Sequence, residues 1–473
     1  MIGEDLIVAK PDRVMKRKSR RLPARRVSLP SGKRRSDVSA RTLIYSFLFL
    51  ILTGTILLWL PVSTASGEFS SAIDAAFTAT SAVCVTGLVV VNTAQHWSPF
   101  GQAIILILIQ LGGFGIMTGV TLLLLGLRRR IGLQQRLIVG QSLGQSLIGG
   151  AASLLKRMAL FVLFLEVIGA VIFFIRFSTN QSLARAAWMS IFHSISAFNN
   201  AGFDLFEGST SMQAYQGDAT IVLTTSVLII LGGISFVVLD DIYRKRKFSK
   251  LSLDSKVILV ATAELLLTGW AITLLMEFNN PSTLGTLTLP GKLLASFFHS
   301  VTARTAGFTT LNVAAMMPFT LLFTMVLMFI GGVTGSTAGG IKVNTFGLLM
   351  VTLKSTLRGQ QSVGAFRRTI DILQIRRALT IVLLSLLVLI IAIFLLSLTQ
   401  KTELLSTLFE AVSAFGTVGL STGITPVLSV AGRIIIMTTI FIGRLGPVTL
   451  ASALIQRQRP GNYHDPGGTI RLG

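Results

Sequence analysis

Apolar residues gather in eight long stretches along the chain. One crossing of a bilayer core needs about 20 apolar residues in a helix, and stretches of this kind occupy residues 42–62, 100–127, 158–175, 219–243, 257–276, 317–350, 378–398 and 434–454. The first stretch has no convincing small-residue cleavage site after it, so it reads as a retained span rather than a signal peptide. The pattern predicts an all-α integral membrane protein with eight transmembrane helices.

A shorter, partly polar segment lies within each successive pair of spans. Aligned on a glycine, the four segments read FTATSAVCVTGL, FHSISAFNNAGF, FHSVTARTAGF and FEAVSAFGTVGL. Their glycines are Gly87, Gly202, Gly307 and Gly419, and each segment opens with a phenylalanine: Phe77, Phe192, Phe298 and Phe409. Such repetition indicates one supersecondary unit of span, pore helix and span, used four times.

The glycine ends of these segments predict the chemistry. The segments are too short to span, and lipid cannot satisfy backbone carbonyls, which are tolerated only where they line a water-filled path. Four re-entrant pore loops around a pseudo-fourfold central pore would offer a ring of carbonyl oxygens that can replace the hydration shell of a cation. A single such glycine would more often serve packing or a turn, so the hypothesis depends on all four being in register.

The pattern divides the chain into six parts. Residues 1–41 contain 13 Lys or Arg against four acidic residues and three prolines, which predicts a disordered basic cytoplasmic tail. The predicted repeat units are residues 42–130, 131–245, 246–370 and 371–455, followed by a C-terminal segment, residues 456–473.

Charge changes the picture from a nucleic-acid binder to an oriented membrane protein. The net charge of +23 is dispersed between apolar runs that make up much of a chain that is 51% hydrophobic and 13% charged. Most Lys and Arg residues outside the tail fall in three alternate connections, so the positive-inside rule places both termini in the cytoplasm. One cysteine excludes an intramolecular disulfide framework and a cysteine-rich zinc site.

The four glycine segments resemble those of the Trk/Ktr/HKT superfamily of potassium and sodium transporters, over roughly residues 42–473. The sequence looks closest to the bacterial KtrB branch, because only a polar tail precedes the first span. In this family glycine at all four positions goes with potassium permeation, and serine in the first repeat with sodium selectivity. Gly87 therefore implies potassium.

The resemblance implies a selectivity filter whose main-chain carbonyls bind K+. The filter residues are Val85, Thr86, Gly87, Asn200, Ala201, Gly202, Thr305, Ala306, Gly307, Thr417, Val418 and Gly419. The third segment is one residue shorter between Phe298 and Gly307, unless Phe297 is the true equivalent of the other opening phenylalanines.

A second glycine repeat follows each filter segment and expands in the third unit into GGVTGSTAGG, residues 331–340. Each glycine weakens a helix by about 1 kcal/mol relative to alanine, so a continuous helix is improbable there. We expect an intramembrane loop that gates the filter, as the resemblance also implies; the alternative is a glycine-rich packing kink. The predicted gate residues are Gly331, Gly332, Gly335, Ser336, Thr337, Gly339, Gly340, Lys342 and Arg444.

Arg444 lies within the eighth apolar stretch, where a charge requires a cavity or a partner. It is predicted to form an electrostatic barrier in the pore opposite the glycine-rich loop. An ion pair with Glu166 or Glu264 is the alternative that the sequence leaves open.

Cofactors and partners follow from the resemblance. It implies a homodimer with the C-terminal segment at the subunit contact, a cytoplasmic RCK-type (KtrA-like) nucleotide-binding ring, and sodium-dependent uptake with Na+ as an activating ion. The chain has no phosphate-binding motif of the Walker type, so nucleotide is expected on the partner and no covalent cofactor here. The tail or an interfacial helix could contact membrane lipid, and no nucleic-acid partner is expected.

The predicted function is potassium uptake by a multi-pass protein of the bacterial plasma membrane, not catalysis. The first alternative is a sodium-permeating member of the same superfamily. A membrane-embedded transferase would need paired catalytic acids; Asp240 and Asp241 are the only adjacent acids at the end of a span, and the sequence offers them no catalytic partner.

Overall fold

Helices make up nearly all of the regular structure. The structure is a computed structural model that describes residues 34–115, 151–206, 208, 211–360 and 362–446, without the side chains of residues 34–43 and 151–155. The helices, taken in the predicted units, are α1 (Arg34–Trp59), α2 (Ala72–Val83), α3 (Thr93–His96) and α4 (Pro99–Gly113); α7 (Ala151–Phe177), α8 (Leu183–Phe198), α9 (Ala219–Gly233) and α10 (Phe236–Lys245); α11 (Leu253–Glu277), α12 (Leu289–Thr302), α13 (Pro318–Phe329) and α14 (Val343–Leu357); and α15 (Ile372–Thr399), α16 (Leu404–Gly416) and α17 (Val430–Leu445).

Short elements complete the described chain. A two-residue hairpin, β1 (Gly364–Ala365) with β2 (Arg368–Thr369), links α14 to α15 and pairs antiparallel in the register Gly364 with Thr369. Single 3-10 turns are η1 (Pro61–Ser63), η3 (Ser211–Tyr215), η4 (Phe248–Lys250), η5 (Val313–Ala315) and η6 (Thr425–Val427).

Each unit repeats one long helix followed by two short helices. The first helices contain 26, 27, 25 and 28 residues, and at 1.5 Å per residue each exceeds the roughly 30 Å core of a bilayer. The last helices, α4, α9, α13 and α17, contain only 12 to 16 residues. Three of them begin at polar caps, since Ser98, Asp218 and Ser429 accept backbone hydrogen bonds from the first turns of α4, α9 and α17, whereas α13 begins at Pro318.

Three described helices are long and apolar enough to cross a membrane: Lys156–Phe177, Leu253–Glu277 and Ile372–Thr399. A fourth candidate is a bent pair, α9 and α10, whose axes differ by 94°. The single continuous span predicted over residues 219–243 is therefore wrong as a straight helix. The chain breaks at Ile234, and Ser235 caps the new helix by accepting from the Val237 amide. The count of eight spans stays a prediction.

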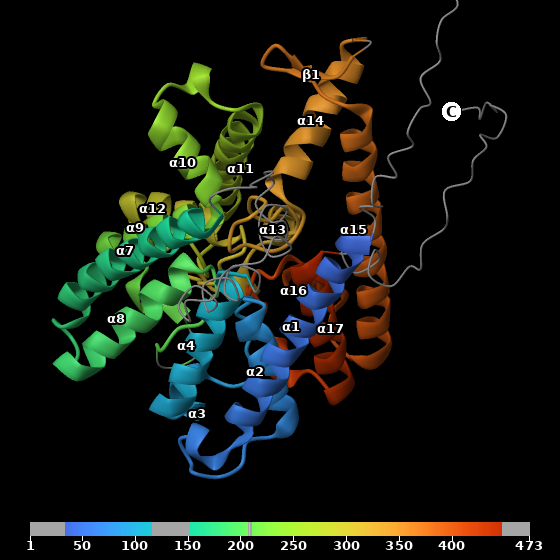
Figure 1. Cartoon of the computed structure of the whole chain (residues 1–473). Helices are drawn as coiled ribbons and strands as arrows, with labels where there is room; N and C mark the ends of the chain where they lie inside the picture. The colour runs from blue at the N-terminus through green and yellow to red at the C-terminus, as the bar shows by residue number, and fades with distance from the viewer. Residues whose placement is uncertain (1–33, 116–150, 207, 209–210, 361, 447–473) are drawn as a thin grey trace, which may run out of the picture.

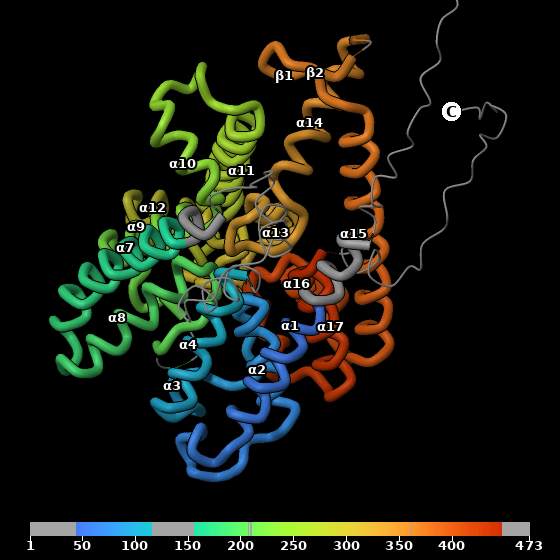
Figure 2. Tube along the Cα trace, in the orientation of Figure 1, coloured from blue at the N-terminus to red at the C-terminus, as the bar shows by residue number. Residues whose placement is uncertain are grey.

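The ends of the chain come together in space. The first unit, drawn in blue, and the last, drawn in red, lie side by side (Figure 2), and Arg433 of α17 donates to Asp74 of α2. Helices α7 and α8 lie on one flank and α15 on the opposite flank, while α10 and the β1 hairpin lie at one end of the molecule (Figure 1).

Four short helices, α2, α8, α12 and α16, lie in the core. Their opening phenylalanines, Phe77, Phe192, Phe298 and Phe409, are all fully buried. The carboxyl-terminal halves of the four helices are buried as well, and the segments that follow them contact one another.

Candidate functional site: a ring of four glycine segments

The four glycines close into a ring. A β-carbon added to Gly87 would meet the Ala201 carbonyl oxygen at 2.6 Å, and one added to Gly202 would meet the Ala306 oxygen at 2.8 Å. A β-carbon added to Gly307 would meet the Val418 carbonyl oxygen at 2.7 Å, and one added to Gly419 would meet the Thr86 carbonyl oxygen. Each glycine therefore packs against the carbonyl that precedes the glycine of the next unit, in the order one, two, three, four and back to one.

The backbone of each segment has an unusual conformation at two places. The four glycines have φ values of 70° to 92°, where a side chain is strained. Two residues earlier, Val85, Asn200, Thr305 and Thr417 also have positive φ, from 50° to 72°. Three of these are β-branched residues, for which this region is a genuine outlier that costs on the order of 1–3 kcal/mol each. All four residues are among the predicted filter residues, but their residue types do not predict a positive φ.

A hydroxyl of each pore helix holds its segment. The Ser81 and Ser413 hydroxyl oxygens accept from the amides of Gly87 and Gly419, at 3.1 and 3.2 Å. In units two and three the hydroxyl instead donates to the carbonyl just after the glycine, Ser196 to Phe203 and Thr302 to Phe308, both at 2.6 Å. These four side chains hold the glycine segments against the short helices that precede them. They were not among the residues predicted from the sequence.

The same contacts settle the register of the shorter third segment. Each hydroxyl lies four positions after its opening phenylalanine, and Thr302 keeps that spacing from Phe298. Phe298 is fully buried like its three counterparts, whereas Phe297 is only partly buried. Phe298 is therefore the true equivalent, and the missing residue falls between Thr302 and Gly307.

A second set of glycines brings the pore helices close to the last helices. A β-carbon on Gly112, Gly232 or Gly443 would collide with the carbonyl oxygen of Val83, Phe198 or Phe415, respectively. Each of these carbonyls lies four positions before the ring glycine of its own unit. In units one, two and four these glycines therefore allow the last helix to approach the end of the short helix closely.

A cavity of about 320 Å³ opens on one side of the ring. All four glycines line it, together with the residues that follow them in the chain, among them Asp204, Thr309 and Ser421. We call this cavity the vestibule. The residues just before the glycines are not among its lining, and Thr417 lies against Gly339 of the glycine-rich loop.

The glycine-rich segment is a loop, as predicted. Helix α13 ends at Phe329 and α14 begins at Val343, and the loop closes on itself because the Gly331 amide donates to the Ile341 carbonyl at 2.8 Å. Its middle crosses to unit two, where the Thr337 hydroxyl donates to the Gly232 carbonyl at 3.0 Å. A β-carbon on Gly339 would collide with the Thr417 hydroxyl, so the loop passes directly beneath the fourth segment.

Two cations hold the loop from its own side of the ring. The Lys342 ammonium donates to the Ala338 carbonyl at 2.6 Å. Arg444 donates to the Thr337 carbonyl and, at 2.7 Å, to the Gly112 carbonyl of unit one. The residues predicted as the gate in units three and four thus come together, and Arg444 joins them to unit one.

The alternative left open by the sequence, an ion pair of Arg444 with Glu166 or Glu264, is wrong, because Arg444 donates to the Thr337 and Gly112 carbonyls. Glu166 is buried and accepts from Gln110 at 3.1 Å and from Asn199 at 3.1 Å, while Glu264 lies exposed on α11. The packing of α17 turns Arg444 toward backbone carbonyls instead. Helical periodicity could not show this, because both partners belong to other units.

Ligand chemistry at the ring is that of neutral oxygens. The described part of the chain holds no group of three or more His, Cys, Asp or Glu side chains that could bind a metal ion. His193 and His299 contact threonine hydroxyls, Thr225 at 3.1 Å and Thr324 at 3.0 Å. Backbone oxygens without a fixed negative charge suit a weakly held monovalent cation that must enter and leave.

Comparisons with known proteins agree with this arrangement. The TrkH family, described as a cation transport protein, matches residues 25–460. The chain is 41% identical over 433 residues to the Ktr system potassium uptake protein B of Bacillus subtilis, covering 92% of this chain and 96% of that protein. It is 40% identical over 433 residues to the potassium/sodium uptake protein NtpJ of Enterococcus hirae, covering 90% and 95%.

A solved structure has the same fold. The potassium transporter TrkH from Vibrio parahaemolyticus aligns with a TM-score of 0.68 and 20% identity, covering 91% of this chain and 86% of that chain. The expected membership of the Trk/Ktr group is confirmed, and so is the prediction of a transporter rather than an enzyme. The chain belongs to the TrkH family of cation transport proteins.

Proposed function

We propose that this protein takes up potassium across the bacterial plasma membrane through the ring of four glycine segments. The closure of the ring carries the proposal, since each glycine contacts the carbonyl of the next unit. The relatives named as potassium uptake proteins are similar over nearly the whole chain, which supports potassium as the cargo.

In this proposal the ring is the selectivity filter. The carbonyls of the residues at and just before Gly87, Gly202, Gly307 and Gly419 replace the hydration shell of K+. The ring is held rigid by the buried hydroxyls behind it, and paired positive φ values support carbonyls turned toward one axis. The glycine at the first position, rather than serine, supports potassium over sodium.

The glycine-rich loop is the gate and Arg444 its barrier. The loop packs under Thr417 and is tied to units two and four by hydrogen bonds from Thr337 and Arg444. These bonds link backbone carbonyls across three units, so opening would require the loop to leave all of them together. A guanidinium beside the path would repel cations while the loop is closed.

The protein is proposed to work with partners. The Bacillus relative is named as a component of a Ktr system, which supports a regulatory subunit for this chain. We propose a homodimer on a cytoplasmic nucleotide-binding ring of the RCK type, with both termini cytoplasmic, Na+ as an activating ion, and the four unit boundaries given above. The C-terminal segment proposed for the subunit contact lies outside the described residues.

Rescue of a potassium-uptake-deficient bacterium tests the function. The wild type, expressed with its regulatory partner, should restore growth at low potassium, and added sodium should increase uptake. Gly87→Ser should shift permeation toward sodium while the protein remains in the membrane. Absence of rescue by an expressed wild type would overturn potassium uptake.

Sodium permeation is the second candidate. It is favoured by the similarity to a relative whose name includes both ions, the potassium/sodium uptake protein NtpJ. Purified protein in vesicles, loaded with either ion, separates the two: sodium flux equal to potassium flux in the wild type supports the second candidate.

A further inference from the structure

We propose that the vestibule contains a cation-binding site separate from the glycine ring, with Asp204 as its charged ligand and Ser421 as a neutral ligand across the pore. The site takes a partly hydrated monovalent alkali cation before it enters the ring. This inference rests on the proposed function, because it names where the same cargo waits.

Among the described residues, the lining of the vestibule contains a single ionisable side chain, that of Asp204. Besides the four glycines, the rest of the lining includes apolar residues, amides and hydroxyls. With about 320 Å³ and roughly 30 Å³ per water, the cavity has room for a cation and several of its waters. A carboxylate in this restricted space attracts cations more strongly than one on an open surface.

Asp204 is held in place by the adjoining turn. Its Oδ2 accepts from the Ser211 hydroxyl at 2.7 Å, and its Oδ1 accepts only a long contact, 3.3 Å, from the Phe206 amide. Ser211 has a positive φ of 48°, a strained conformation of the kind found at functional sites. Ser211 also accepts from the Thr309 amide at 3.3 Å, so the carboxylate is tied to unit three as well as to its own unit.

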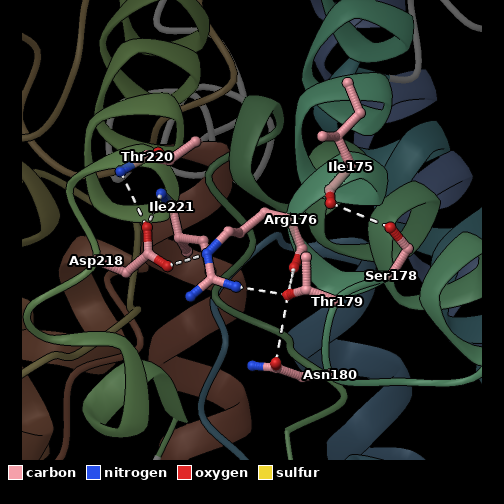
Figure 3. Close-up of polar contacts among 8 residues, drawn as sticks. All are labelled: Ile175, Arg176, Ser178, Thr179, Asn180, Asp218, Thr220 and Ile221. Carbon is pink, nitrogen blue, oxygen red and sulfur yellow. Dashed lines mark hydrogen bonds and ion pairs between the residues drawn. The ribbon is translucent and has the colours of Figure 1, made fainter.

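The turn that carries Ser211 is fixed at its other end by an ion pair. Figure 3 shows Arg176 of α7 donating to Asp218 at 2.5 Å, while Asp218 also accepts from the amides of Thr220 and Ile221. The Asp218 amide in turn donates to the Tyr215 carbonyl at 2.9 Å. The hydroxyl that holds the Asp204 carboxylate therefore belongs to a braced turn, which suits the support of a binding group more than a loose loop would.

Unit four supplies the opposite side of the vestibule. The ring places units two and four diagonally, since unit two contacts units one and three. Ser421 and Thr425 line the cavity, and both hydroxyls donate to the buried Glu410, Ser421 at 2.9 Å. Both protons are donated to Glu410, while the Ser421 oxygen also accepts from the Gly423 amide at 2.9 Å and lies 3.0 Å from the Thr425 hydroxyl. With its proton on Glu410 and one lone pair on Gly423, the Ser421 hydroxyl has one lone pair left for a cation in the cavity. Glu410 acts as a positioning residue behind them.

The ligand set selects the class of ion. A Ca2+ site uses six to eight oxygens with several carboxylates, and Mg2+ demands octahedral geometry. One carboxylate with neutral hydroxyls in a wide cavity matches a monovalent ion that keeps part of its water. The site differs from the ring, where four equivalent units offer only uncharged oxygens: at the second position after each glycine the units have Val89, Asp204, Thr309 and Ser421.

Kinetics of uptake into vesicles test the site. We expect Asp204→Asn to raise the KM for K+ about tenfold while the maximal rate stays within about twofold, because a unit charge a few ångströms from the ion is worth about 1.4 kcal/mol or more at a protein surface. Asp204→Glu, which keeps the charge, should stay near the wild type. Ser421→Ala and Glu410→Gln should give smaller rises in KM, about threefold.

Glu68→Gln is the matched control. Glu68 is exposed in the connection between α1 and α2 and does not line the vestibule. The substitution therefore removes one negative charge from the protein without changing the vestibule. An unchanged KM in Asp204→Asn, or an equal rise in Glu68→Gln, would overturn the site. If the Asp204→Asn protein does not reach the membrane, the site is tested with Ser421→Ala instead. An unchanged KM for K+ in Ser421→Ala would then overturn the site. A wild type that moves neither K+ nor Na+ refutes the proposed function instead, which separates the two failures.

Discussion

The two faces of the glycine ring are built on different rules. At the ring all four units contribute the same parts: a glycine at positive φ, a strained residue two positions earlier, and a hydroxyl behind. On the loop side only unit three supplies the long glycine-rich segment and only unit four supplies Arg444. In the proposed function, a cation in the ring must be surrounded evenly, whereas a gate needs one movable part with defined contacts.

The vestibule side is also asymmetric, but for a different reason. There the units differ in side chains rather than in backbone, with a single carboxylate in unit two. Repetition thus governs the narrowest point, and divergence governs what lies on either side of it. The predictions below test this comparison, from the largest expected effect to the smallest.

Gly202→Ala should reduce uptake to background. The new β-carbon would lie 2.8 Å from the Ala306 carbonyl oxygen, closer than real β-carbons approach backbone, so the ring must distort. Gly67→Ala is the control, because Gly67 has nearly the same φ, 73° against 70°, with nothing within 4 Å. Potassium uptake in cells measures both, and wild-type uptake by a membrane-inserted Gly202→Ala would exclude the ring as the path.

Deleting part of the loop between Gly335 and Gly340 should raise potassium flux in vesicles about tenfold or more. The deletion removes the hydrogen bonds of Thr337 with Gly232 and Arg444. It also removes the hydrogen bond from Lys342 to Ala338, and each of these bonds contributes about 1 kcal/mol. Flux and regulation that match the wild type would count against a gate.

Arg444→Ala should raise flux by a smaller factor, about threefold to tenfold. It removes the bonds to Thr337 and Gly112 but leaves the loop itself intact. Arg358→Ala, at an exposed position after α14, serves as control for the loss of a cation. A folded Arg444→Ala with unaltered rate and affinity would refute the barrier.

The mildest effect concerns pH. Burial raises the pKa of Asp204 to about 6, although the bonds from Ser211 and the Phe206 amide lower it in part. The charged carboxylate binds cations, so KM should be constant above pH 7 and should rise about twofold at pH 6, where half of the carboxyls are protonated. The KM for K+, measured from uptake between pH 5 and 8, tests this. Glu410 and His193 are the other titratable groups near the lining of the vestibule. Asp204→Asn should abolish the pH dependence, and a retained dependence would assign it to one of those two.

Much of the fold could be predicted because it depends on residues that are close together in the sequence. Long apolar runs gave the first helix of each unit, and the four phenylalanines proved equally buried. The break in the sixth apolar stretch, in unit three, was also predictable, since five glycines within ten residues weaken a helix wherever it lies. The break at Ile234 was missed because only Ser235 and two glycines mark it, within an otherwise apolar run.

The sequence by itself determined the four repeats, the glycine at each tip and the interrupted helix of unit three, because composition and spacing act within a few turns of the chain. The tertiary structure alone decided that the tips meet in cyclic order, that Arg444 reaches carbonyls 107 and 332 positions away, and that Asp204 enters the vestibule. These contacts join units that are far apart in the chain, and they depend on how whole helices pack rather than on any local preference.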